Sequence, residues 1–290
     1  MLTFNSEKIR ESLRCPVCRA KMEISYEHSG LLFCEGERRH CYDFASGGYV
    51  NLSSPGQSGG GDSKQAVRAR TDFLETGYYS AIRDKLCDLV RNKLGNSGNC
   101  ANKFVVDAGC GEGYYTSAVA KLGFATAGFD LSKYAVDVAS RRAKKDQLGN
   151  SFFGVASVYS LPIADCSADA VVNVFAPCAQ KEYSRVLKNG GYLLVVCAGP
   201  EHLIGLKRAL YDKIYINEPR ADMPTELMHI GTERLNYDIT VNGNANIKNL
   251  FSMTPYYWKT SPGDVHKLEN IEKLITKIDI LFEIYQKIEE

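Results

Sequence analysis

The stretch from Val105 to Gly123 reads VVDAGCGEGYYTSAVAKLG and passes from an apolar run into a glycine-rich turn and then into a helix-like pattern. The apolar, valine-rich run predicts a buried strand. Gly109, Gly111 and Gly113 have no side chain and so allow a ligand to approach the backbone closely. The stretch therefore predicts a strand, a turn and a helix with a ligand at the carboxyl end of the strand.

The chain on either side of this stretch alternates between strand-like and helix-like segments. Two helices are predicted between residues 63 and 95, before the first strand. Further strands, with helical spacing between most of them, are predicted at 125–130, 151–157, 168–177, 192–199 and 271–288. Strands that are apolar throughout imply a sheet covered on both faces. The expected fold class is α/β, a doubly wound and mostly parallel sheet, with a small β module before it.

The acidic residues of the glycine turn argue against a phosphate ligand. The spacing G-x-G-x-G differs from the dinucleotide spacing G-x-G-x-x-G, and Asp107 and Glu112 put negative charge where a pyrophosphate needs positive charge. S-adenosylmethionine carries a positive sulfonium and no phosphate, so it suits such a turn. About twenty residues further on, Asp130 ends the next strand, where a carboxylate can bind both hydroxyls of a ribose. These three acids, with Gly109 and Gly111, are the predicted cofactor residues; a turn kept only for close packing is the alternative.

Cysteines cluster near the start of the chain. Cys15 and Cys18 form a C-x2-C knuckle, and Cys34 with either His40 or Cys41 supplies a second pair. Zinc favours four such ligands in a tetrahedron, and a module this small needs metal to fold. The sequence thus predicts one structural zinc ion. Unrelated thiols are one alternative, and a redox-active C-x-x-C is another, although the βαβ pattern typical of redox motifs is missing.

Length, charge and hydropathy limit the class of protein. The chain has 290 residues and a formal net charge of only +1, so charge alone does not predict a nucleic-acid partner. No apolar run approaches the roughly 18 residues that span a bilayer, and the start lacks the apolar core of a signal peptide. A cytoplasmic protein without a membrane partner is expected. The expected organisation is a zinc-binding module at 1–52, a flexible Gly/Ser linker at 53–62 and a larger domain at 63–290.

Several motifs along the chain carry a resemblance to one family. They are HCYDFASGGYVNL at the end of the zinc module, ARTDFLETGYY after the linker, and then DAGCGEGYYT, FAPC and GPEHL. Together they resemble the bacterial 23S ribosomal RNA guanine-N1 methyltransferases over nearly the whole chain. The resemblance implies a class I, Rossmann-like methyltransferase that transfers a methyl group from S-adenosylmethionine to N1 of a guanine in a hairpin loop of 23S ribosomal RNA. It also implies a possible homodimer with a joint RNA cleft.

The resemblance further implies which residues bind the metal and the cofactor. The implied zinc ligands are Cys15, Cys18, Cys34 and His40, with Cys41 as the alternative fourth ligand. The implied cofactor contacts are Tyr79, Gly111, Glu112, Asp130 and His202. Taken alone, Tyr79 and His202 look like an ordinary helix aromatic and an ordinary loop histidine.

The loop after the strand at 168–177 lies where the acceptor is expected in this fold. Asn173, Phe175 and Pro177 are therefore substrate-side candidates, although a plain strand-to-helix turn explains them equally well. Pro177 and Cys178 also suggest a rival chemistry, because RNA cytosine carbon-5 methyltransferases attack through a Pro-Cys thiolate in this region. If guanine is the acceptor, Cys178 is a packing residue. Guanine N1 is hidden in a base pair, so the target is expected to be unpaired or flipped out; no residue is identified as its base.

Two further classes of protein stay open. A non-enzymatic RNA-binding protein is one, although the intact turn and Asp130 argue against it. A small-molecule methyltransferase with a zinc appendage is the other, and residues 209–224 could cover its substrate. The zinc module is expected either to be a plain scaffold or to contact RNA through basic and aromatic side chains, namely Arg14, Arg19, Lys21, Arg38, Arg39, Tyr26 and Phe33. Arg68 and Arg70 are expected to contact phosphate or to face solvent.

Overall fold

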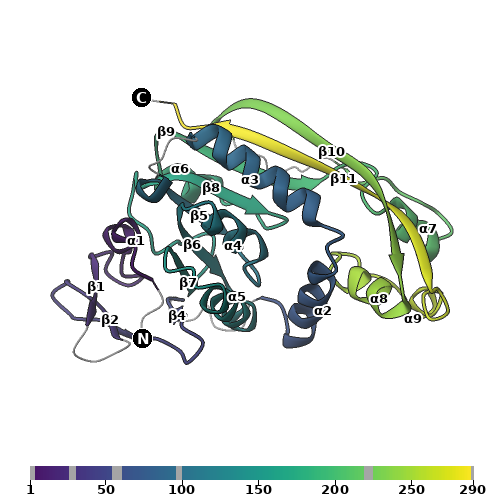
Figure 1. Cartoon of the computed structure of the whole chain (residues 1–290), viewed down its shortest axis with the longest axis horizontal. Coiled ribbons are helices and arrows are strands. Elements are labelled where there is room, and N and C mark those ends of the chain that lie inside the picture. The colour runs from purple at the N-terminus through teal and green to yellow at the C-terminus, as the bar shows by residue number, and fades with distance from the viewer. Residues whose placement is uncertain (1–3, 26–30, 54–60, 96–99, 219–224, 289–290) are drawn as a thin grey trace.

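An eight-stranded sheet dominates the computed structural model, which describes residues 4–25, 31–53, 61–95, 100–218 and 225–288 (Figure 1). The strand order is β10-β11-β9-β8-β5-β6-β7-β4. The strands are β4 (Val50–Asn51), β5 (Phe104–Ala108), β6 (Ala125–Asp130), β7 (Ser151–Val155), β8 (Ala168–Val174), β9 (Leu187–Ala198), β10 (Met228–Asn242) and β11 (Lys273–Gln286). Six neighbouring strands, from β9 to β4, are parallel, whereas β11 is antiparallel to both β9 and β10. The predicted α/β class with a mostly parallel sheet is confirmed.

Helices cover both faces of this sheet because successive strand residues point to opposite sides. The helices are α1 (Glu7–Ser12), α2 (Lys64–Glu75), α3 (Ser80–Leu94), α4 (Tyr114–Lys121), α5 (Lys133–Lys145), α6 (Gln180–Val186), α7 (Ile204–Leu210), α8 (Asn244–Ser252) and α9 (Pro262–His266), with a 3-10 turn at Cys100–Asn102. Val105 packs in the apolar cluster that includes residues of α3, α4 and α8. Its neighbours Phe104 and Val106 pack in a second cluster with residues of α1 and α6.

The expected element boundaries hold for most of the chain and shift at three places. The strand expected at 168–177 ends at Val174, because Phe175 turns into the left-handed region with φ +53°. The strand expected from residue 192 begins earlier, at Leu187. The strand expected at 151–157 ends at Val155. The closing strand at 271–288 is confirmed as β11, which is antiparallel.

The N-terminal residues form a small antiparallel sheet of β1 (Met22–Ser25), β2 (Leu31–Cys34) and β3 (Cys41–Asp43) at one end of the molecule (Figure 1). This part shares a core with the large sheet, since Leu13 forms a bridge to Ile163 and β4 pairs in parallel with β7 as the edge strand of that sheet. Most of the expected linker, residues 54–60, lies outside the described residues, as does Tyr26. The division into units at 1–52, 53–62 and 63–290 stays a prediction. None of the described helices is long and apolar enough to cross a membrane.

Candidate functional site

A cavity of about 990 Å³ lies at the carboxyl ends of β5, β6, β7, β8 and β9. The turn between β5 and α4 forms its floor, and α2 and the segment after α8 contribute further walls. This is the edge at which open α/β sheets bind their ligands. The volume is at the upper end of the roughly 300–1,000 Å³ of small-molecule sites, which leaves room for more than one ligand group.

The glycine turn has the backbone geometry that its sequence requires. Gly109 and Gly111 adopt φ values of +89° and +52°, in the region that residues with side chains avoid. A Cβ atom on Gly109 would collide with the side chain of Ala176, and one on Gly111 would come within 3.3 Å of the Arg70 guanidinium. Both glycines line the cavity. Their backbone can therefore contact a ligand directly, as predicted.

Asp130 ends β6 and lines the same cavity. Its carboxylate accepts hydrogen bonds from the backbone N–H groups of Gly111 (3.1 Å) and Ser132 (2.8 Å). Burial raises the pKa of Asp130, and these two bonds act in the opposite direction. The bonds fix the carboxylate beside the glycine turn, at the position expected for a ribose-binding acid.

Arg70 contacts the acids of the turn. It projects from α2, and its Nε donates to Glu112 Oε2 at 2.6 Å, while Nη1 pairs with Asp62. Burial opposes the charge on Arg70, but the two carboxylates raise its pKa above the ordinary value. The expectation of a phosphate contact or of solvent exposure is therefore not met for Arg70. In contrast, Arg68 is exposed and lies 3.8 Å from Asp72.

The charge of the cavity favours a cationic ligand. Among the described residues that line it, four carboxylates stand against one guanidinium; the carboxylates are Asp62, Glu112, Asp130 and Glu218. A negative surface around a concave site attracts cations and repels phosphate groups. A sulfonium with an ammonium group fits this set of charges, and a pyrophosphate does not.

Asp107 lies beneath the turn and is not among the residues that line the cavity. Its Oδ2 accepts a hydrogen bond of 2.5 Å from Thr116 Oγ1, whereas its buried Oδ1 has no partner among the described residues. Burial, with smaller contributions from the carboxylates of Asp130 and Glu112, raises the pKa of Asp107 to about 7. Asp107 was expected to contact the cofactor, but its carboxyl is buried behind the turn and does not face the cavity.

His202 and Tyr79 meet at the other side of the cavity. The Nδ1 of His202 accepts the backbone N–H of Asp279 (3.3 Å), so the proton resides on Nε2, which lies 3.3 Å from the Tyr79 hydroxyl. Burial lowers the pKa of His202 to about 4, and the imidazole is therefore neutral at physiological pH. Both side chains line the cavity, so two residues from distant parts of the chain lie together as the predicted roles require.

Two of the three substrate-side candidates line the cavity, and the third does not. Phe175 and Pro177 line the cavity, and the Phe175 ring stacks on His202 with centroids 6.1 Å apart and planes inclined by 16°. Asn173 does not face the acceptor: it is fully buried, and its amide donates to Pro177 O (2.9 Å) and the Tyr183 hydroxyl (2.8 Å). Its role is to hold the loop from beneath.

Cys178 is buried in the core cluster beneath the sheet and is not among the described residues that line the cavity. A nucleophile has to reach its substrate within bonding distance. The position of Cys178 therefore favours the packing role and disfavours thiolate attack on a cytosine.

The four expected zinc ligands lie together. The ligand atoms of Cys15, Cys18, Cys34 and His40 are all within 4.8 Å of one another. The Sγ atoms of Cys18 and Cys34 are 3.6 Å apart, and His40 Nδ1 lies 3.4 Å from Cys34 Sγ. Bond lengths of about 2.0–2.3 Å in a tetrahedron give ligand separations of about 3.4–3.8 Å, so these side chains fit a zinc ion. Cys41 is outside this group; its exposed thiol contacts Arg39 O.

The basic side chains of the zinc module are partly engaged within the protein. Arg19 donates to the carbonyls of Leu161 (2.9 Å) and Ile163 (2.7 Å), and therefore joins the knuckle to the loop after β7. The Arg39 guanidinium lies 3.7 Å over the Phe33 ring. These two bonds favour the scaffold role for Arg19, and its contact with RNA stays a prediction.

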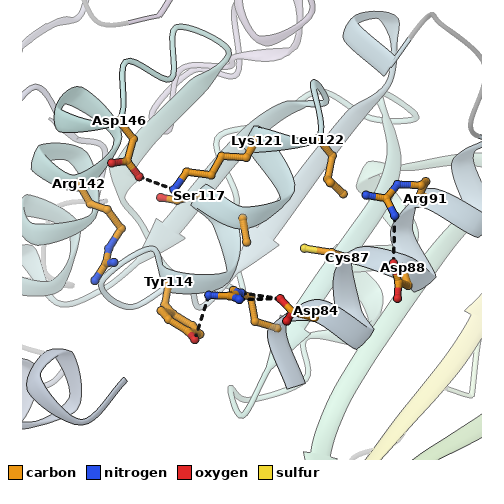
Figure 2. Close-up of a pocket in the computed structure, with 12 residues that line it drawn as sticks. Asp84, Cys87, Asp88, Arg91, Tyr114, Ser117, Lys121, Leu122, Arg142 and Asp146 are labelled. Carbon is orange, nitrogen blue, oxygen red and sulfur yellow. Dashed lines mark hydrogen bonds and ion pairs between the residues drawn. The ribbon is translucent and has the colours of Figure 1, made fainter. Parts of the chain in front are cut away.

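A second cavity, of about 490 Å³, lies between α3 and α4 (Figure 2). Its cations are paired with neighbouring acids: Lys121 with Asp146 at 2.7 Å and Arg91 with Asp88 at 3.0 Å (Figure 2). None of the predicted site residues lines it. The larger cavity is therefore the candidate functional site.

Sequence reasoning missed several residues that line the larger cavity. They are Tyr115, Tyr159, Glu218, Met253, Tyr256 and Trp258. Most of these come from loops and from the C-terminal third of the chain, where no local motif singles them out.

Comparison with known proteins identifies the family. A family model described as "Methyltransferase domain" matches residues 106–195. The Bacillus subtilis (strain 168) protein YxjB, named as a 23S rRNA (guanine-N(1)-)-methyltransferase, is 31% identical over 278 residues, which cover 92% of this chain and 94% of YxjB. The 23S rRNA (guanine(748)-N(1))-methyltransferase of Streptomyces fradiae is 31% identical over 261 residues, covering 87% of this chain and 88% of the relative.

Among solved structures, a geranyl diphosphate methyltransferase in complex with S-adenosylmethionine is 18% identical, with a TM-score of 0.46 over 80% of this chain and 94% of that one. The two curated relatives match most of the length of the chain. The chain therefore belongs to the family of 23S rRNA (guanine-N(1)-)-methyltransferases.

Proposed function

We propose that this protein transfers the methyl group of S-adenosylmethionine to N1 of a guanine in 23S ribosomal RNA. The observation that carries the proposal is the negatively charged cavity at the glycine turn, in a chain that matches relatives of this activity over 92% of its length. The guanine is expected in a hairpin loop, where its Watson–Crick edge is accessible. The homodimer and the cytoplasmic location stay predictions.

The cofactor half of the site is assigned to the residues around the glycine turn. Bound S-adenosylmethionine supplies an electrophilic methyl group on a positive sulfur. Asp130 is placed to accept hydrogen bonds from the ribose hydroxyls, and the backbone of Gly109 and Gly111 allows close approach. Glu112 pairs with Arg70 at the turn and contributes negative charge near the cation. Tyr79 and His202 bind as neutral hydrogen-bonding groups.

The acceptor half is assigned to Phe175 and Pro177. The backbone of Phe175 has φ +53°, a conformation that costs a bulky residue about 1–3 kcal/mol, and its ring stacks on His202. Such strain persists where the surrounding structure positions a functional group. A flat base can stack against this ring, so that its edge meets the methyl group in line with the sulfur. Positioning of this kind supplies much of the rate acceleration in a displacement reaction.

We also propose one structural zinc ion, bound by Cys15, Cys18, Cys34 and His40. The fit of the four ligand atoms to a tetrahedron supports it. Zinc would fix the knuckle from which Arg19 reaches Leu161 O, four residues along from Ser157 in the cavity wall. The metal thus supports the cofactor cavity from behind and takes no part in the chemistry.

The test offers the purified protein two classes of acceptor. It is incubated with methyl-labelled cofactor and either deproteinised 23S ribosomal RNA from a strain that lacks the enzyme or a small-molecule extract of the same cells. Label is expected in the RNA fraction and is expected to fall in the Asp130→Ala variant at cofactor concentrations near the wild-type Kd. Label confined to the small-molecule fraction would replace the proposal with a metabolite methyltransferase.

A further inference from the structure

Three aromatic side chains on the wall of the large cavity are exposed to solvent. The exposed fractions are 44% for Phe175, 63% for Tyr159 and 78% for Trp258. Burying an aromatic side chain is strongly favourable, so large exposed rings around one cavity indicate a binding surface. Trp258 is the most exposed of them and the only tryptophan in the chain.

Trp258 is held in place despite its exposure. It lies in the segment after α8, where Tyr257 N–H donates to Thr254 O (3.1 Å) and Lys259 N–H donates to Tyr256 O (2.9 Å). The Trp258 ring meets Tyr257 edge-on, with centroids 5.0 Å apart, and Tyr257 in turn packs on the buried Phe251 at 5.2 Å. This chain of rings supports the indole from one side. Its exposed surface is thus preorganised for a partner, which lowers the entropic cost of binding.

The surroundings of Trp258 suit an uncharged, flat ligand. The neighbouring cavity residues Leu250, Met253, Pro255 and Tyr256 carry no charge, whereas the acids of the cavity are on the turn, β6 and two flanking segments. Trp258 also lies outside residues 106–195, which match the general methyltransferase domain and supply the turn and Asp130. Trp258 is thus separate from the turn and from Asp130, which are assigned to the cofactor, and its exposed ring can contact the acceptor.

We propose that Trp258 stacks on an unpaired base of the RNA at the mouth of the cavity and thereby positions the substrate loop for methylation. The inference rests on the proposed function, because it takes RNA as the acceptor. Base stacking on an aromatic side chain needs no particular base, so Trp258 contributes affinity for a single-stranded loop and leaves the choice of guanine to the inner cavity. Lys259, exposed beside it, can meet the backbone of the same nucleotide.

The fluorescence of this single tryptophan reports on the contact directly. An RNA hairpin that contains the unmethylated target guanine is titrated into the full-length protein. A parallel titration uses S-adenosylhomocysteine alone. We expect quenching by the hairpin and little change with S-adenosylhomocysteine. Quenching by the cofactor product alone would assign the indole to the cofactor and overturn the proposal.

Substitutions separate stacking from a structural role. Trp258→Leu is expected to raise KM for RNA by about five- to 150-fold, with kcat and the cofactor Kd within about twofold of wild type. Trp258→Phe keeps a ring and is expected to recover most of the affinity. The control is Ile275→Ala, at a residue that is 62% exposed and does not line the cavity.

Two results would overturn the proposal: an unchanged KM for RNA in Trp258→Leu, or a change confined to the cofactor Kd. Failure of the proposed function is distinguishable from these outcomes. A wild-type protein that labels no guanine at all contradicts the proposed function, whereas a wild type that labels guanine, beside an unaffected Trp258→Leu, contradicts only the stacking role.

Discussion

Replacing Asp107 with asparagine is expected to stabilise the ligand-free protein at alkaline pH. Burial raises the pKa of this carboxyl to about 7 in the folded protein, against an ordinary value of 3.8. The folded state therefore holds a proton between these two values that the unfolded state has already released. In this window the contribution of Asp107 to stability falls as pH rises, and above pH 7 the buried charge costs its full amount.

The size of the effect follows from the two pKa values. The pKa difference of about 3 between the folded and unfolded states lowers the free energy of unfolding by about 4 kcal/mol at pH 8. About 2 kcal/mol of this loss is already present at pH 5. Asparagine carries no charge and keeps an oxygen that can accept the Thr116 hydroxyl. Its buried N–H donors cost about 1–3 kcal/mol, but this cost does not depend on pH. The gain from Asp107→Asn is thus expected to be about 2–3 kcal/mol larger at pH 8 than at pH 5.

Urea unfolding at the two pH values measures this difference. The matched control is Asp169→Asn, because ion pairs with Lys188 and Lys103 and a bond from Phe104 N–H outweigh burial and lower the pKa of Asp169. That variant is expected to lose stability at pH 8. An equal effect of Asp107→Asn at both pH values, or a larger loss at pH 8, would refute the reasoning.

Three further predictions follow from contacts of the site. Asp130→Ala is expected to weaken cofactor binding by about 10- to 100-fold in calorimetric titration, because charge-assisted hydrogen bonds contribute about 1.5–3 kcal/mol; unchanged affinity would remove Asp130 from the site. Arg70→Met is expected to destabilise by about 3–5 kcal/mol in urea unfolding, since it leaves the buried Glu112 unpaired, and adding Glu112→Gln should restore part of the loss; no recovery would contradict the pairing. Elemental analysis should find about one zinc per chain, lost in His40→Ala and kept in Cys41→Ser; the reverse pattern would make Cys41 the fourth ligand.

The fold was predictable because its signals are local. The strand, glycine turn and helix of residues 105–123 and the acid at the end of the next strand carry their geometry in the sequence itself. The choice between His40 and Cys41 was not open to such reasoning. Neighbouring residues of an extended chain point to opposite sides, so only one can face the metal, and which one depends on the start of β3.

Other parts of the site depend on long-range packing that no local pattern encodes. Arg70 and Glu112 are 42 residues apart in the sequence, so nothing near Arg70 in the chain indicates that the two side chains pair at the cavity. Asn173 lies on a strand that is buried on both faces, and alternation therefore cannot tell which face it occupies. Trp258 belongs to no motif of the sequence, and it reaches the cavity because α8 ends at Ser252 and leaves the indole in the following loop.

The identity of the methylated nucleoside tests most directly whether the protein methylates guanine at N1. After transfer of labelled methyl groups to 23S ribosomal RNA, the RNA is digested to nucleosides and the labelled product is identified by chromatography and mass spectrometry. We expect label in 1-methylguanosine. Label in 5-methylcytidine would contradict it, because that product requires a thiolate such as Cys178 to reach the base from its place in the core.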